Sequence, residues 1–117
     1  MAKQLETKDI IANLEKKFPE MTGEFKRLQV EQYETFCRKQ WDYGPYNIAV
    51  GTRLENEDEV NMSLSGLWFR VYDKLSRLKS LVLEKKQAAN EPVIDAWKDM
   101  SVYGLIAQLV MNGKWAK

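Results

Sequence analysis

Three basic side chains in the second half of the chain, Arg70, Lys74 and Arg77, are spaced so that they could act together. In an α-helix, positions i, i+4 and i+7 lie on one face, which here borders an apolar stripe. Arg and Lys grouped on a helix can bind phosphate, because a guanidinium group can donate to two oxygens at once. The same spacing also fits a solvated face with ion pairs one turn apart, such as Asp73 with Arg77.

Two carboxylates, Asp95 and Asp99, lie one helical turn apart further along the chain, and Tyr103 continues the same line. Carboxylates at i and i+4 can converge on a point beside the helix, which suits a divalent cation such as Mg²⁺. Asp95 could instead favour the N-terminal end of the helix dipole, an explanation that is weaker for Asp99. The main alternative is a salt bridge from these carboxylates to the basic residues described above, because buried charges are normally paired.

A further acidic pair, Glu31 and Glu34, lies one turn apart in an earlier helical segment. Such a pair could supply two oxygen ligands to a metal ion. Glu-x-x-Glu is common on solvated helix faces, so the pattern alone favours the solvated interpretation.

Residues 41–47 form an aromatic segment that we expect to be a loop, since Gly-Pro is a poor helix continuation. Within it, Tyr43 and Tyr46 could stack on a base, and Asn47 could contact a base edge or a sugar. Lys39 adds a cation just before the segment. The alternative is a plug that covers one end of a helical bundle, and both interpretations stay open.

Composition limits the chemistry that these residues can perform. The chain has no His and one cysteine, Cys37, which excludes His-based triads, the usual zinc sites and an internal disulfide. With 18 basic and 17 acidic residues the net charge is +1, so we expect no long nucleic acid as partner. There is no apolar run long enough for a membrane span and no signal-peptide pattern at the start, so we expect a cytoplasmic protein.

Apolar periodicity predicts four long helices, at about residues 3–17, 20–40, 61–87 and 91–111. The third shows it most clearly, with an apolar stripe made of Leu64, Leu67, Trp68, Val71, Leu75, Leu78 and Val82. Asn112-Gly113 is a typical helix stop after the fourth. Short connections favour antiparallel neighbours, so we expect one all-α domain over residues 1–117. Its architecture would be an antiparallel four-helix bundle with the aromatic loop between the second and third long helices.

Four blocks in this order resemble the phage-associated nucleotide-modification-associated domain family, over roughly residues 30–110. The blocks are Lys39-x-x-Asp42-Tyr43-Gly44, Asn47, Arg70-x-x-Asp73-Lys74-x-x-Arg77 and Asp95-x-x-x-Asp99-x-x-x-Tyr103. The resemblance implies a phage-type protein of nucleotide metabolism or modification, with a nucleotide bound by Lys39, Tyr43, Tyr46, Asn47, Arg70, Lys74, Arg77 and Tyr103. It also implies the host cell cytoplasm as its location.

The helical arrangement is also similar to the all-α nucleotide pyrophosphohydrolases of the MazG and dimeric dUTPase type. That similarity implies Mg²⁺ as cofactor, with Glu31 and Glu34 as one half of the metal site and Asp95 and Asp99 as the other. The second half departs from those enzymes, which typically show Glu-x-x-Asp there, so hydrolysis is a weaker expectation than nucleotide binding.

Three functions therefore remain open. The first is nucleotide binding, with possible Mg²⁺-dependent pyrophosphohydrolysis. The second is a non-catalytic sponge that sequesters a cyclic or signalling nucleotide of bacterial anti-phage immunity, in which carboxylates orient the basic side chains. The third is a ligand-free helical interaction module whose charge clusters are salt bridges. Four Trp and much apolar helix surface in a small chain predict a homo-oligomer in each case.

Overall fold

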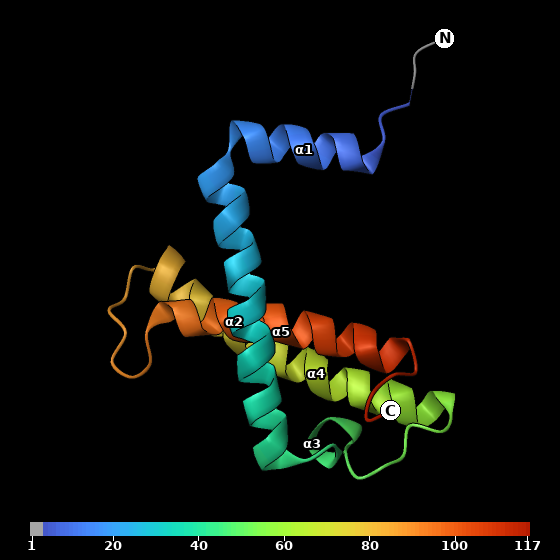
Figure 1. Ribbon diagram of the computed structural model, residues 1–117. Coiled ribbons are helices and arrows are strands. Elements are labelled where there is room, and N and C mark those ends of the chain that lie inside the picture. Colours follow the sequence, from blue (N-terminus) through green and yellow to red (C-terminus); the bar gives the residue numbers. More distant parts are fainter. Residues whose placement is uncertain (1–3) are drawn as a thin grey trace. The chain divides into compact units, whose positions relative to one another are not determined.

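A computed structural model describes residues 4–117, and every regular element in that part of the chain is a helix. Figure 1 shows them in chain order, and the all-α prediction is confirmed. The chain divides into two compact units, residues 1–37 and residues 38–117. Residue 3, which we expected to begin the first helix, lies outside the described residues.

The first unit consists of α1 (Thr7–Lys17) and most of α2 (Pro19–Tyr43). Asp9 in the first turn of α1, and Lys16 and Lys17 in its last turn, complement the helix dipole. α1 ends at Phe18 because Pro19 follows, and Pro19 then occupies the first position of α2, where a missing N–H costs nothing. No residue of either helix is buried.

α2 continues three residues further than the sequence predicted, so Trp41 to Tyr43 are helical. Gly44, with φ at 70°, ends the helix, and Pro45 leads into α3 (Tyr46–Ala49). The structure therefore does not confirm an aromatic loop over residues 41–47, since only Gly44 and Pro45 in it are non-helical. Gly-Pro correctly marked the break, but short helices resume immediately on both sides of it.

α4 (Glu57–Leu78) begins four residues earlier than predicted because the acidic connector forms its first turn. The Asn56 side chain accepts a hydrogen bond from the Glu59 backbone N–H at 2.9 Å, and Glu59 in turn accepts from the backbone N–H of Glu55 at 3.0 Å. This reciprocal pairing satisfies amides that the helix start would leave unpaired. At its other end α4 passes into a π-helical segment, η1 (Lys79–Leu83).

α5 (Val93–Met111) ends as predicted at Asn112-Gly113. The Gly113 N–H donates to Val110 O at 3.1 Å and the Lys114 N–H to Leu109 O at 2.9 Å, the pattern of a Schellman motif. This turn sends the chain back so that Trp115 is buried, and its Nε1 donates to Pro45 O at 3.0 Å. The segment after α5 is thereby fastened to the start of α3.

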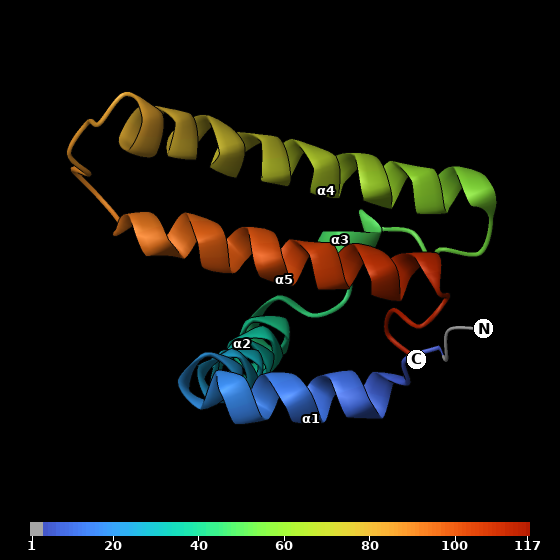
Figure 2. The same ribbon diagram turned by 90° about the horizontal axis from the view of Figure 1, so that it is seen from above.

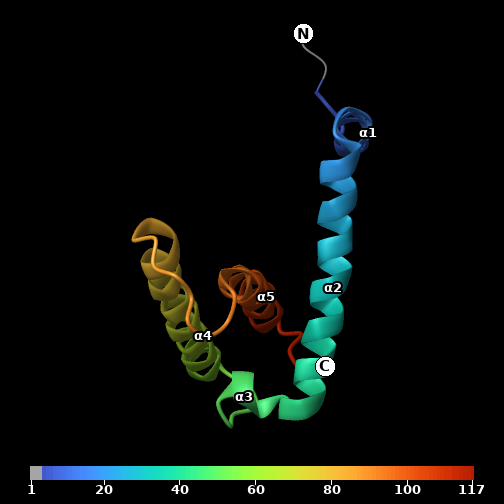
Figure 3. The ribbon, with the colours of Figure 1, turned by 90° about the vertical axis from the view of Figure 1, so that its left-hand side faces the viewer.

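The second unit is built on α4 and α5, which run antiparallel and side by side (Figure 2). Its buried apolar side chains come from α3, α4, α5 and the segment after α5, and are Ile48, Ala49, Leu67, Leu78, Ala96, Ile106, Val110 and Trp115. α3 packs on α4 (Figure 3), where the buried Ser63 Oγ donates to Ile48 O at 2.6 Å. An antiparallel helix pair is thus observed within this unit, while the four-helix bundle is not confirmed.

We predict that Trp115→Ala lowers the free energy of unfolding by about 3–5 kcal/mol, because it removes a buried indole and its hydrogen bond to α3. Urea denaturation measures this change. Trp41→Ala is the matched control, since the Trp41 side chain is 89% exposed and its loss should cost below about 0.5 kcal/mol. Equal effects of the two substitutions would contradict the described packing of Trp115.

Candidate functional site

The Asp99 carboxylate of α5 joins two lysines, one from α4 and one from the last residues of α2, which belong to the second unit. Its Oδ2 lies 3.0 Å from Lys74 Nζ of α4, and its Oδ1 lies 3.5 Å from Lys39 Nζ near the end of α2. The Asp99 and Lys74 side chains are only 20% and 25% exposed, whereas Lys39 is 54% exposed. One carboxylate thus pairs with two ammonium groups at a half-buried point.

The ion pair changes the protonation behaviour of Lys74. Its pKa is raised above the ordinary value of 10.5, chiefly because the ammonium donates a hydrogen bond to Asp99. Burial acts in the opposite direction, and electrostatic interactions with Asp99, Tyr103 and Glu91 raise the pKa further. Lys74 therefore carries a full positive charge at neutral pH. Tyr103 lies close enough to interact electrostatically with Lys74.

Arg70 and Arg77 support the fold at different places, although both share a helix face with Lys74. Arg70 Nη2 donates to the backbone oxygen of Asn47 in α3 at 3.0 Å. Arg77 Nη1 donates to Pro92 O at 3.2 Å, and its Nη2 donates to Glu91 O, just before α5 begins. The predicted basic face is present, but its three members contact three different segments.

The aromatic residues predicted to hold a base or sugar lie mostly at the surface. Tyr43 and Tyr46 are exposed. Tyr46 lines an open hollow of about 390 Å³ that Arg53, Trp115 and Lys117 also line. Sequence analysis did not single out Arg53, because an isolated Arg in a connecting segment carries no spacing signal.

Two buried side-chain amide oxygens, Gln40 Oε1 and Asn47 Oδ1, have no donor among the residues that the structure describes. Gln40 follows Lys39 directly near the end of α2, and Asn47 lies in the next helix, α3. Buried polar atoms are normally paired, so these two oxygens are exceptions within the described residues. Sequence analysis predicted a role for Asn47 and missed Gln40.

The acidic residues predicted to hold Mg²⁺ are distributed over both units. Glu31 accepts from Arg27 Nη1 at 2.9 Å, in the first unit. Asp99 is engaged by two ammonium groups in the second unit, a setting that disfavours a divalent cation. Within residues 4–117 no three Asp, Glu or Cys side chains form a group that could hold a metal ion. The site of Glu31, Glu34, Asp95 and Asp99 therefore gains no support and stays a prediction.

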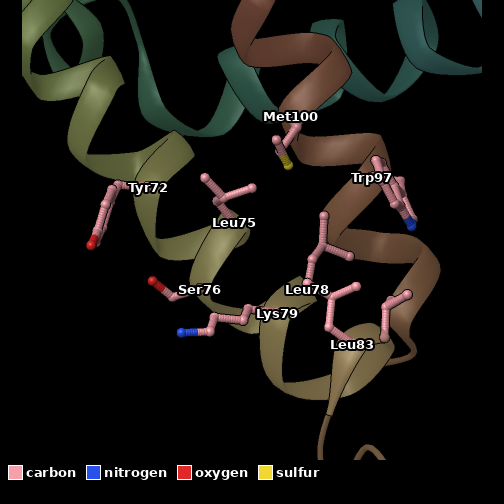
Figure 4. A pocket seen from close by; sticks show the side chains of 9 residues that line it. Tyr72, Leu75, Ser76, Leu78, Lys79, Leu83, Trp97 and Met100 are labelled. Carbon is pink, nitrogen blue, oxygen red and sulfur yellow. The ribbon is translucent and has the colours of Figure 1, made fainter. Parts of the chain in front are cut away.

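A second hollow, of about 400 Å³, lies where α4 meets η1 and faces α5. Figure 4 shows its apolar walls, with Leu75 and Leu78 from α4, Leu83 from η1, and Trp97 and Met100 from α5. Its only charged lining residue is Lys79, so its chemistry does not suit a nucleotide with several phosphates. The periodicity of these residues predicted a packed face rather than a hollow.

No protein-family model matches the sequence, and neither the curated proteins nor the solved structures that were compared with it are similar to it. None of the helices in residues 4–117 combines the length and the apolar character needed to cross a membrane. The interpretation of the site therefore depends on its geometry.

The raised pKa of Lys74 predicts a specific pH dependence of stability. Because the folded-state pKa lies above 10.5, the Lys74–Asp99 pair stabilises the fold fully below pH 10.5 and loses its effect as the pH rises through the folded-state value. We expect Lys74→Met to cost about 1–2 kcal/mol near pH 8 and much less near pH 12, measured by urea denaturation.

The matched control is Lys114→Met, an exposed lysine that follows α5. It should change the free energy of unfolding little at either pH. A cost of Lys74→Met that stays constant up to pH 12 would show that packing of its methylene chain, not its charge, is responsible.

Proposed function

We propose that this chain binds a nucleotide, with Lys39 and Lys74 holding its phosphate groups. The observation that carries the proposal is the convergence of two ammonium groups on Asp99. That of Lys74, 25 residues earlier in the chain, lies at 3.0 Å, and that of Lys39, 60 residues earlier, lies at 3.5 Å. A carboxylate shared by two lysines keeps both ammonium groups in place while leaving them a net positive charge. A phosphate can then bind without the full cost of ordering two flexible side chains.

The surroundings of the cluster fit the rest of a nucleotide. Tyr43 offers an exposed ring for stacking, and Asn47 follows it in α3 as a candidate contact to a base or sugar. Tyr103 lies in the field of Lys74 and can donate to a phosphate oxygen. Arg70 and Arg77 hold α3 and the start of α5 in position beside the cluster, so we assign them a supporting role.

Among the nucleotide-binding functions, this geometry favours binding without metal-assisted hydrolysis. Asp99 orients two lysines and is not free for a cation, which is the role that a sponge for a signalling nucleotide would give it. The four sequence blocks that resemble the phage nucleotide-modification-associated family support a nucleotide as the ligand. We accordingly propose a phage-type, cytoplasmic nucleotide-binding protein.

Mg²⁺-dependent pyrophosphohydrolysis is the alternative, and it would need Glu31 and Glu34 to meet Asp95 and Asp99 around a metal. The ligand-free interaction module is the second alternative, and the structural contacts of Arg70 and Arg77 favour it. The antiparallel four-helix bundle and the homo-oligomer remain proposals in each case.

We expect nucleoside triphosphates or cyclic dinucleotides to bind with and without Mg²⁺, as measured by isothermal titration calorimetry over a panel of both. Lys39→Gln should weaken the binding about tenfold, because one charge-assisted contact to phosphate is lost. Its own pair with Asp99 is long and its side chain is more than half exposed, so the fold should keep its stability. Lys114→Gln is the control and should bind as the unmodified chain does.

The same panel separates the alternatives. Release of pyrophosphate only with Mg²⁺, abolished by Glu31→Gln, would replace the proposal by hydrolysis. Absence of any heat of binding and of any rise in melting temperature across the panel would contradict nucleotide binding and favour the interaction module.

A further inference from the structure

The hollow between α4, η1 and α5 has walls that belong to one compact unit. Every residue that lines it lies between Tyr72 and Met100, within residues 38–117. The shape of its walls is therefore set inside that unit, by the packing of α5 on α4 and of η1 on α4. Its volume of about 400 Å³ lies within the range of small-molecule sites, toward the lower end.

The π-helical turn η1 explains why α4 and α5 leave a hollow here. The Glu84 N–H donates to Lys79 O, five residues earlier, at 3.0 Å, so this turn holds more residues than an α-helical one. Side chains after Lys79 therefore leave the register that Leu75 and Leu78 set, and the apolar stripe of α4 does not continue as a closed packing face. Single π-helical turns are rare and frequently lie at functional sites.

One edge of this hollow is polar, although most of its lining is apolar. Tyr72, Ser76 and Lys79 follow one another at i, i+4 and i+7, so they share one side of the helix. Figure 4 shows their two oxygens and the ammonium nitrogen toward one side of the hollow, with Leu83 and Trp97 on the opposite side. Each of the three groups can donate a hydrogen bond, so the edge is suited to a group that accepts several.

Lys79 gives this edge a positive charge that the hollow itself does not balance. Its ammonium group forms no ion pair or hydrogen bond with the residues that the structure describes. None of the nine residues that line the hollow is acidic. A molecule that fills the hollow therefore meets apolar walls and one cation, and an anionic group beside Lys79 would complement that charge.

We propose that this hollow binds a small amphiphile, a hydrocarbon chain that ends in one carboxylate. The hydrocarbon would contact Leu78, Leu83 and Trp97, and the carboxylate would accept from Lys79 and from the Ser76 hydroxyl. At the ~30 Å³ that one water takes in the liquid, about 400 Å³ holds roughly 13 non-hydrogen atoms, the size of a medium-chain fatty acid. This inference does not depend on nucleotide binding, because it concerns different residues.

Isothermal titration calorimetry of the intact chain with straight-chain fatty acids, each below its micelle concentration, tests the proposal. We expect one decanoate to bind per chain, and octanoate to bind about tenfold more weakly because two buried methylenes are lost. The affinity should level off beyond decanoate, because a longer hydrocarbon extends outside the hollow. A flat apolar surface would instead give an affinity that keeps rising with chain length.

The substitution Lys79→Glu tests the contact to the carboxylate. It should weaken decanoate binding more than tenfold and create binding of decyltrimethylammonium, a cation of the same chain length that the unmodified protein should not bind. Lys114→Glu is the matched control, because it makes the same change of charge at an exposed lysine that does not line the hollow. Circular dichroism of both variants should show unchanged helix content, since both lysines are exposed.

Absence of any heat of binding across the fatty acids would overturn the proposal, and would mean that protein already covers the hollow or that it is too shallow to hold an acid. Decanoate binding that Lys79→Glu leaves unchanged would overturn it too, because the acid would then bind elsewhere or through its hydrocarbon alone. Equal weakening by Lys79→Glu and Lys114→Glu would show an effect of net charge and would equally contradict a carboxylate contact at Lys79.

Discussion

The contact on which the candidate site depends is the sharing of one carboxylate between two ammonium groups. Asp99 can occupy its position because Ala96, one turn before it on α5, is almost fully buried, which fixes how α5 lies against α4. Lys74 then meets Asp99 from α4, and Lys39 reaches it from the end of α2. Without the anion, two lysines this close would repel each other and turn toward water.

In the proposed site, the same contact favours phosphate binding over metal binding. A divalent cation needs several free oxygens at one point, whereas here the best-placed carboxylate is already neutralised. A phosphate group needs a local surplus of cations on a prepared framework, and two lysines sharing one carboxylate provide it. Arg70 donates to the backbone of α3, and Arg77 donates to the backbone just before α5. These two residues of the basic face therefore hold neighbouring segments in position and need not contact a ligand themselves.

Sequence patterns predicted local features well where a single helix or turn determines them. The stop at Asn112-Gly113 and the break at Gly44-Pro45 both lie where turn chemistry indicated. The salt bridge between the acidic line of α5 and the basic line of α4 was among the interpretations that spacing allowed, and the structure places it at Lys74 and Asp99. Lys39 joining Asp99 across sixty residues, and the π-helical turn η1, have no local signal.

Periodicity also predicted which helix sides are apolar, but not what covers them. In the stripe of α4, Leu67 and Leu78 are buried, whereas Trp68 and Leu75 are more than half exposed. An apolar stripe looks the same in the sequence whether a neighbouring helix, a ligand or another chain covers it. The same reasoning applies to the apolar positions of α2, whose pattern in the sequence does not say what covers them.

The most direct test of the proposed site is NMR of the lysine side-chain ammonium groups during titration with the nucleotide panel. The account predicts that the signals of Lys39 and Lys74 shift together and first, while that of Lys114 stays in place. It would be contradicted if a nucleotide bound and shifted other lysines while those of Lys39 and Lys74 did not move, or if no lysine signal responded to any nucleotide.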